Sequence, residues 1–255
     1  MRKGVIMVHS ILLLGQSNMG GRGFADEVEP IDNTRLYVLR NGRWRKLYVP
    51  VNPDRITSGI NLAETFAYQY SVDHDVDVGI IPCADGGSSL SQWMPGTLLF
   101  DHACYQAELA SRTSTIAAIL WHQGESDCDV VNEPLYKDRL TTIIAALRDK
   151  LGLHDVPFIM GGLGDFLNDF SPHYAEHHKI VNGIIESIAD DEKQIGFTPA
   201  TGLGGNPDNM HFSAAGLREF GYRYYEEFRR LERPDKVFEE RNTFDSGIKN
   251  VLEAL

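Results

Sequence analysis

The strongest constraint on the fold is a pattern that recurs along the chain, in which a short apolar run stops abruptly at a glycine-rich polar segment. Four such runs are expected to be buried strands, at residues 11–14, 76–81, 116–121 and 156–160. Amphipathic segments with helical spacing separate them. This alternation predicts an α/β fold, a three-layer α/β/α sandwich around a mostly parallel, doubly wound sheet of the flavodoxin-like kind.

Residues that begin and end helices refine this expectation. A helix is expected from Tyr136 to Leu151, because apolar residues recur there at helical spacing and Pro134 and Gly152 bracket the segment. Asn61 and Glu64 form a capping box that begins another helix. The remaining expected elements are strands at 35–39 and 44–49 joined by an Asn41-Gly42 hairpin, helices at 100–111, at 174–188 and after Ser213, and a strand at 195–197.

Length and composition are compatible with a single domain. A chain of 255 residues with 42% hydrophobic side chains can bury a substantial core. We expect one α/β domain over residues 1–232 and a charged extension over 233–255 that could form a short docking helix. The formal net charge of −12 disfavours nucleic-acid binding, since such proteins need clustered Lys and Arg, and it suits a neutral or cationic small ligand.

The sequence gives no clear signal for export or membrane insertion. Arg2 and Lys3 precede a mostly apolar stretch, but no small-residue cleavage site follows, so we interpret this stretch as the first strand. No segment reaches the roughly 18 continuous apolar residues of a membrane span. The three cysteines are widely spaced and form no C-x-x-C pair. These features predict a cytoplasmic location and no membrane partner.

Polar residues follow three of the expected strands. Ser17 lies in GQSNM after the first strand, Gly86 and Gly87 follow the second, and His122-Gln123-Gly124-Glu125 follows the third. Because the carboxyl ends of parallel strands meet at one edge of a sheet, these loops should converge there. A fourth segment, DNMHF at 208–212, precedes the last helix and is expected at the same edge.

The converging residue types are those that acyl transfer needs. A hydroxyl nucleophile requires an imidazole base, a carboxylate that orients the base, and hydrogen-bond donors for the oxyanion. Ser17 would supply the hydroxyl, and His211 and Asp208 would supply the base and the carboxylate. Their offset of three residues suits a single turn, so one local loop could carry both groups.

The four motifs GQSNM, GGSSLSQW, WHQGESD and DNMHF, in this order, resemble those of the SGNH hydrolase superfamily. More closely, they are similar to carbohydrate esterase family 6 and the sialate O-acetylesterase-like domain. The resemblance covers about residues 10–230. It implies a Ser-His-Asp esterase that removes acetyl groups from sugar hydroxyls, with no cofactor and no metal, acting on a small-molecule or oligosaccharide ester.

The resemblance also implies a role for individual residues. Ser17 matches the nucleophile, and Asp208 and His211 match the final D-x-x-H pair. The backbone N–H groups of Ser17 and of Gly86 or Gly87 match the oxyanion donors. In the wider superfamily an aspartate precedes the nucleophile and an asparagine stands in the third motif, whereas here these positions are Gln16 and Gln123. Gln123 is therefore expected either to donate to the oxyanion or to position a backbone group that does.

Four further residues are candidates for support or substrate binding. Gln16, Asn18 and Glu125 are polar residues within the motifs, and such residues either serve the substrate or tie neighbouring loops together. Trp93 is expected either as a sugar-stacking wall or as a core residue. His122 is interpreted as a structural hydrogen-bonding residue.

Two other functions are compatible with parts of the sequence. His173, Glu176 and His177 match the H-x-x-E-H pattern of some zinc peptidases, in which two histidines one helical turn apart bind zinc. A non-catalytic sugar-binding domain with the same fold is the second alternative, and the intact Ser17 and His211 disfavour it. The acetylated sugar and the oligomeric state stay open at this stage.

Overall fold

The computed structural model describes residues 8–232, which form a seven-stranded sheet in the order β3-β2-β4-β1-β5-β6-β7. All neighbouring strands are parallel except the β2–β3 hairpin at one edge. The strands are β1 Val8–Gly15, β2 Leu36–Arg40, β3 Arg43–Lys46, β4 Val78–Pro82, β5 Ser114–His122, β6 Phe158–Gly161 and β7 Ile195–Thr198.

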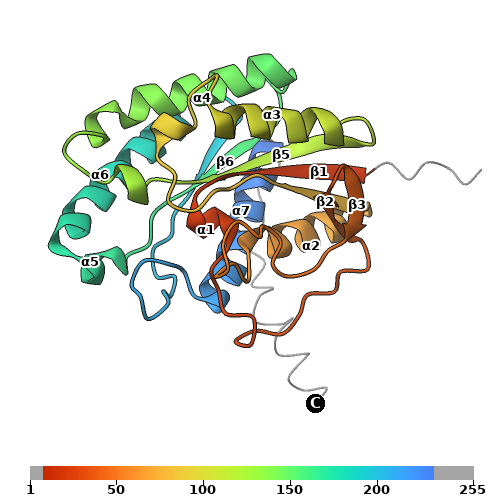
Figure 1. Cartoon of the computed structure of the whole chain (residues 1–255), viewed down its shortest axis with the longest axis horizontal. Coiled ribbons are helices and arrows are strands. Elements are labelled where there is room, and N and C mark those ends of the chain that lie inside the picture. The colour runs from red at the N-terminus through yellow and green to blue at the C-terminus, as the bar shows by residue number, and fades with distance from the viewer. Residues whose placement is uncertain (1–7, 233–255) are drawn as a thin grey trace, which may run out of the picture.

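Helices cover both faces of this sheet. The helices α3, α4 and α6 lie on one face, and α2 and α7 lie on the other (Figure 1). Their bounds are α1 Ser17–Gly20, α2 Leu62–His74, α3 Leu98–Ala110, α4 Tyr136–Leu151, α5 Leu167–Phe170, α6 Pro172–Asp191 and α7 Ala214–Glu232. The predicted three-layer α/β/α sandwich with a mostly parallel sheet is therefore confirmed.

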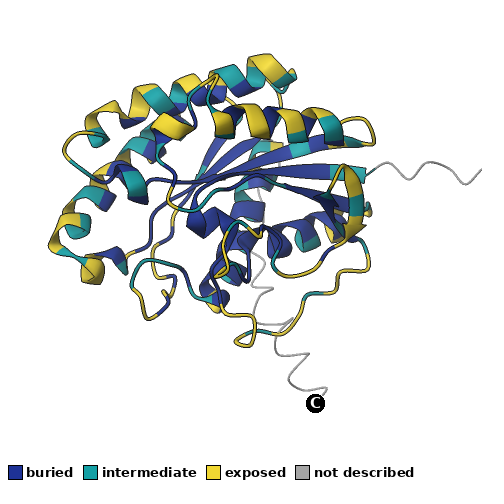
Figure 2. Ribbon diagram, in the orientation of Figure 1, coloured by how far each residue is buried: buried dark blue, intermediate teal, exposed yellow. Residues whose placement is uncertain are grey.

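The core divides into two apolar clusters, one on each face of the sheet. Figure 2 shows the strands buried along their length, while the helices are buried on their inner sides and exposed on their outer sides. Alternate residues of β1 serve the two clusters, since Leu12 and Leu14 belong to one and Ile11 and Leu13 to the other. A strand covered on both faces must be apolar throughout, which explains the continuous run in the sequence.

The predicted helix boundaries follow from local capping. Asn61 accepts a hydrogen bond from the Ala63 N–H, and the Glu64 carboxylate accepts one from the Asn61 N–H, so the capping box at the start of α2 is present. Helix α4 ends at Gly152, whose left-handed conformation suits glycine. Ser213 accepts a hydrogen bond from the Gly216 N–H at the start of α7.

The pairing of β1 with its two neighbours brings the predicted loops together. Residue 13 of β1 lies opposite Pro82 of β4, and Gly15 lies opposite His122 of β5. Gly15 has a φ of +130°, and a Cβ at this position would lie 2.0 Å from the carbonyl oxygen of His122. Only glycine fits here, and the chain can therefore turn sharply and place Ser17 directly after the strand.

Several predictions concern residues at the limits of the structure. The tail at 233–255 and its docking helix lie outside the described residues, and so do residues 1–7.

Cys83, Cys104 and Cys128 are buried free thiols. Within residues 8–232, no helix is both long and apolar enough to cross a membrane.

Candidate active site

Three predicted residues form a continuous hydrogen-bonded chain at the carboxyl edge of the sheet. The Nε2 of His211 lies 3.0 Å from the Oγ of Ser17, and its Nδ1 lies 2.7 Å from the Oδ2 of Asp208. This is the arrangement that lets an imidazole take a proton from a hydroxyl while a carboxylate fixes its tautomer. The structure thus brings together residues that are 194 positions apart in the sequence.

The carboxylate of Asp208 is held by its own turn. Its Oδ1 accepts hydrogen bonds from the backbone N–H groups of Met210 and His211. Partial burial alone would raise the pKa of this carboxyl, but the hydrogen bonds from the His211 ring and from the two N–H groups lower it below its ordinary value. Asp208 therefore stays ionised throughout the neutral pH range.

Asn18 ties the nucleophile to the loop that carries the base. Its amide nitrogen donates to the carbonyl of Met210 and to the carboxylate of Glu125, and its amide oxygen accepts from the N–H of Phe212. These contacts hold the residues on both sides of His211. Asn18 is buried and does not line the pocket, so the structure supports its predicted supporting role and places it away from substrate.

Two backbone N–H groups near Ser17 are free to bind an oxyanion. Among the described residues, the N–H groups of Ser17 and Gly87 have no hydrogen-bond acceptor, and both residues line the same pocket. The Gly86 N–H instead donates to the Oδ2 of Asp54 at 2.8 Å. The sequence left open whether Gly86 or Gly87 donates to the oxyanion, and this geometry favours Gly87.

Gln123 does not reach the pocket with its side chain. Its amide nitrogen donates to the Gln16 side chain, to the carbonyl of Ser88 and to the carboxylate of Asp127, at 3.1, 3.1 and 2.6 Å. An amide has two protons, and these acceptors already share both. Direct donation by the Gln123 side chain to the oxyanion is contradicted by this geometry. The alternative, that Gln123 positions a backbone donor, stays a prediction. Its side chain bonds the carbonyl of Ser88, the residue next to Gly87.

The predicted supporting residue Gln16 organises the loop after β5. Its side-chain oxygen accepts from the Gln123 side chain and from the backbone N–H groups of Gly124 and Ser126. Nearby, the Nε2 of His122 lies 3.1 Å from the carbonyl oxygen of Gly162, which agrees with the predicted structural role of this histidine. These hydrogen bonds join the ends of β1, β5 and β6 close to the nucleophile.

Glu125 is buried at the base of the pocket. One carboxylate oxygen accepts from Asn18, and the other has no partner among the described residues. The side chain is 3% exposed and lines the pocket. Glu125 therefore contacts Asn18, which holds the loop that carries His211, and its second carboxylate oxygen is a buried unpaired acceptor at the pocket.

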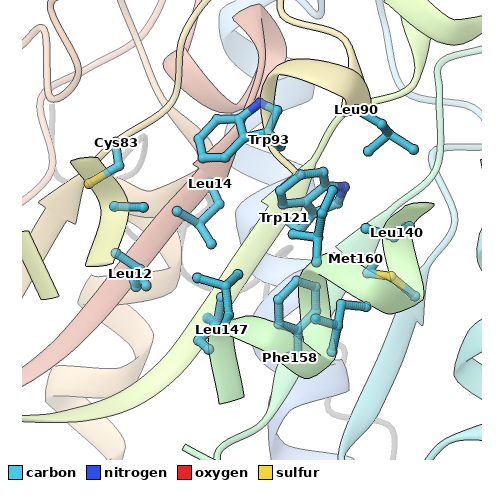
Figure 3. Close-up of a cluster of buried hydrophobic side chains, with 14 of the residues drawn as sticks. Leu12, Leu14, Cys83, Leu90, Trp93, Trp121, Leu140, Leu147, Phe158 and Met160 are labelled. Atoms are coloured by element: carbon cyan, nitrogen blue, oxygen red, sulfur yellow. The ribbon is translucent and has the colours of Figure 1, made fainter. Parts of the chain in front are cut away.

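Trp93 lies in the core, so of its two predicted roles the core role is confirmed and the sugar-stacking wall is contradicted. The side chain is 1% exposed and packs edge-on against Trp121, with ring centroids 5.5 Å apart (Figure 3). Its indole N–H donates to the hydroxyl of Ser88. The sequence left both roles open because Trp93 follows a short turn, and the sequence does not show which side of that turn faces the interior.

The sequence analysis missed a charged network on one side of the pocket. Arg22 forms a two-pronged ion pair with Asp54, with contacts of 3.1 and 2.7 Å, and both side chains are almost fully buried. Burial opposes ionisation of Asp54, but the hydrogen bonds and charge of Arg22 still lower the pKa of this carboxyl. Arg55 extends the network to Asp85 and to the carbonyl of Gly86. The Gly-Arg-Gly segment after the nucleophile was its only sequence signal.

The H-x-x-E-H segment is not arranged as a metal site. His177 lies 2.6 Å from the carboxylate of Glu133, and its ring packs against that of His173 with centroids 4.6 Å apart. Within the part of the chain that the structure describes, no group of three His, Cys, Asp or Glu side chains could hold a metal ion. The described residues therefore give no support to the zinc peptidase alternative, in which His173 and His177 would bind zinc beside Glu176 as the base.

Ser17, Gly87 and His211 line a pocket of about 330 Å³. Its walls come from the ends of β1, β4 and β5, from the start of α6 and from the loop that carries His211. The residues that line it are Gln16, Ser17, Arg22, Arg55, Gly86, Gly87, Glu125, Ser126, Tyr174, Met210 and His211.

Comparison with known proteins identifies the family. A family model described as "Carbohydrate esterase, sialic acid-specific acetylesterase" matches residues 7–230. The chain belongs to this family. The predicted relationship to carbohydrate esterases and sialate O-acetylesterase-like domains is confirmed, and so is the prediction of an ester hydrolase at the level of the family.

Individual relatives agree with this family and with the fold. A probable carbohydrate esterase of Arabidopsis thaliana is 28% identical over 172 residues, which span 58% of this chain and 66% of the relative, just under two thirds of its length. A solved structure of that protein has a TM-score of 0.78 at 23% identity, covering 86% of this chain and 97% of the other.

More distant structures share the fold alone. A carbohydrate acetylesterase from Xanthomonas citri has a TM-score of 0.67 at 18% identity, covering 90% of this chain and 57% of the other. A lipase/acylhydrolase from Enterococcus faecalis has a TM-score of 0.50 at 13% identity, covering 91% and 100%. The predicted SGNH-type fold is confirmed by these likenesses.

Proposed function

We propose that this carbohydrate esterase is a serine esterase that removes acetyl groups from sugar hydroxyls by a Ser-His-Asp mechanism. The observation that carries the proposal is the hydrogen-bond chain from Ser17 through His211 to Asp208 beside an open pocket. The free N–H groups of Ser17 and Gly87 at that pocket supply oxyanion donors. The family description and the names of the relatives support acetylated carbohydrate as the substrate class.

Each group has a defined part in the reaction. The Oγ of Ser17 attacks the acetyl carbonyl carbon while the Nε2 of His211 takes the hydroxyl proton, and the N–H groups of Ser17 and Gly87 bind the resulting oxyanion. The bond from the acetyl carbon to the sugar oxygen then breaks. His211 returns its proton to that oxygen, and the free sugar hydroxyl leaves an acetyl group on Ser17.

The second half of the reaction releases acetate. His211 takes a proton from a water molecule, the water oxygen attacks the acetyl carbon on Ser17, and the collapse of the second tetrahedral intermediate restores the serine hydroxyl. Asp208 holds the imidazole in the correct tautomer during both halves. All proton transfers use groups of this chain and water.

The test is release of the carboxylate, acetate or butyrate, by the purified full chain from four esters. These are vinyl acetate, vinyl butyrate, a mono-O-acetylated methyl xyloside and O-acetylated N-acetylneuraminic acid. We expect hydrolysis of at least one sugar acetate, acetyl preferred over butyryl, and a Ser17→Ala variant that folds but loses activity by several orders of magnitude. A wild type that releases acetate from neither sugar, or a fully active Ser17→Ala protein, would contradict the proposal.

A further inference from the structure

The pocket has one aromatic side, and it comes from the segment that resembled a zinc motif. Tyr174 lies in the first turn of α6, and Ser171 begins this helix and accepts a hydrogen bond from the Tyr174 N–H. Among the described lining residues, Tyr174 is the only aromatic side chain other than His211. Tyr174 thus gives the pocket an aromatic side chain, which Trp93, buried in the core, does not.

Neighbouring rings hold this tyrosine in place. Phe170, at the end of α5, packs edge-on against Tyr174, with ring centroids 5.1 Å apart and an interplanar angle of 87°. His173 makes a similar contact from another side, with centroids 5.5 Å apart. Edge-on packing fixes the orientation of the ring. Tyr174 is half-buried, and Phe170 remains partly exposed beside it.

The hydroxyl of Tyr174 has no hydrogen-bond partner among residues 8–232. The fully buried tyrosines behave differently, since Tyr70, Tyr136, Tyr224 and Tyr225 each place their hydroxyl 2.6 to 2.8 Å from a partner. A tyrosine hydroxyl removed from water ordinarily finds such a partner. The Tyr174 hydroxyl is therefore available to form a hydrogen bond with a ligand in the pocket.

Electrostatics keep this phenol protonated. Burial raises the pKa of Tyr174, and the nearby acidic groups of Cys128, Glu125 and Asp129 raise it further. The hydroxyl is therefore a hydrogen-bond donor at every pH at which the enzyme would work. Arg22 and Arg55 line the same pocket, so its lining combines one tyrosine ring with charged and polar side chains.

This combination matches the chemistry of a sugar. A pyranose ring has apolar C–H faces that pack on aromatic rings, and its edge carries hydroxyl oxygens that accept hydrogen bonds. We propose that Tyr174 determines recognition of the sugar part of the substrate, with its ring against the sugar ring and its hydroxyl donating to a sugar oxygen. This inference rests on the proposed esterase function and adds the residue that distinguishes a sugar acetate from a simple acetate.

The test compares two substrates in two variants. Vinyl acetate has no ring in its leaving group, so its hydrolysis reports on the catalytic groups alone. Hydrolysis of the sugar acetate should also depend on Tyr174. This substrate is either the monoacetylated methyl xyloside or O-acetylated N-acetylneuraminic acid. For the sugar acetate, Tyr174→Phe should lower kcat/KM about 3- to 10-fold through loss of one hydrogen bond. Tyr174→Ala should lower it about 10- to 100-fold, mainly through a higher KM, because the ring is lost as well. Both variants should hydrolyse vinyl acetate within about 3-fold of wild type.

Tyr105→Ala is the matched control, because Tyr105 lies on α3, is 74% exposed and does not line the pocket. It should leave both substrates unaffected. Thermal unfolding checks that each variant folds, and Tyr174→Phe keeps nearly the full volume of the side chain if Tyr174→Ala does not fold. Equal losses on both substrates, or no loss on the sugar acetate, would overturn the inference. A wild type inactive on both sugar acetates would instead contradict the proposed function.

Discussion

Ser17 and His211 reach the same pocket from regions of opposite character. Residues 10–23, which carry Ser17, are buried at every position, and the serine is fixed by the end of a central strand. The loop at 199–213, which carries Asp208 and His211, is largely exposed, and its shape is irregular. The nucleophile is thus placed by the core of the protein, while the base depends on contacts that the loop makes with that core.

These contacts are few and can be identified. Asn18 holds Met210 and Phe212, and Asn206 donates from its side chain to the carbonyl of Arg22. The ring of Phe212 is fully buried and packs against His122, Phe166 and Phe220. An exposed loop can therefore present a base accurately when a few buried anchors fix its ends.

Removing the charge of Asp208 should have the largest effect on the loop side of this comparison. Asp208→Asn keeps much of the shape but loses the preference for the correct imidazole tautomer, so kcat should fall about 10,000-fold. Because the pKa of Asp208 is lowered, the wild-type carboxylate is ionised at neutral pH, and the substitution removes a negative charge from beside the imidazole.

Without the carboxylate, the imidazole of His211 loses the acceptor that fixes its tautomer, so the fall in rate should not be recovered by a change of pH. The measurement is kcat/KM on vinyl acetate between about pH 4 and 9 for the wild type and the variant. An unchanged rate would mean that Asp208 only caps its turn. Glu125 would then be the next candidate to orient the base.

Releasing the loop from the core should have a smaller effect. Asn18→Ala leaves the Met210 carbonyl and the Phe212 N–H without partners and allows His211 to shift. A displacement of about 1 Å can cost about 100-fold, so kcat should fall by up to that factor while KM for vinyl acetate changes little. Asn33→Ala is the control and should retain activity, because Asn33 is exposed and its side chain donates only to the Leu47 carbonyl. Full activity of Asn18→Ala would show that the other contacts of the loop, among them those of Phe212 and Asn206, are enough to place His211.

The sequence was sufficient where local patterns determine structure. Continuous apolar runs identified the buried strands, and the capping box at Asn61 placed the start of α2 correctly. The meeting of Ser17, Asp208 and His211 was also predictable, because the loops after parallel strands share one edge of the sheet.

The errors concern the direction of side chains in irregular segments. The Gln123 amide bonds three acceptors of the protein instead of lining the pocket, and Trp93, for which two roles were open, lies in the core. Tyr174, which belongs to an apparent metal motif, lines the pocket. In a loop, residues have no fixed periodicity, so the exposed face depends on tertiary contacts that a sequence pattern does not contain. The ion pair of Arg22 with Asp54 was missed for the same reason, since 32 residues separate the two.

The most direct test of the central claim is covalent labelling of the nucleophile. Diisopropyl fluorophosphate reacts with serines that an adjacent imidazole activates. Mass spectrometry of the labelled chain should show one phosphoryl adduct, located on Ser17, and the fraction of chains labelled should equal the fraction of esterase activity lost. His211→Ala should label far more slowly. Loss of activity with Ser17 unmodified, or full activity in chains whose Ser17 carries the adduct, would contradict Ser17 as the nucleophile.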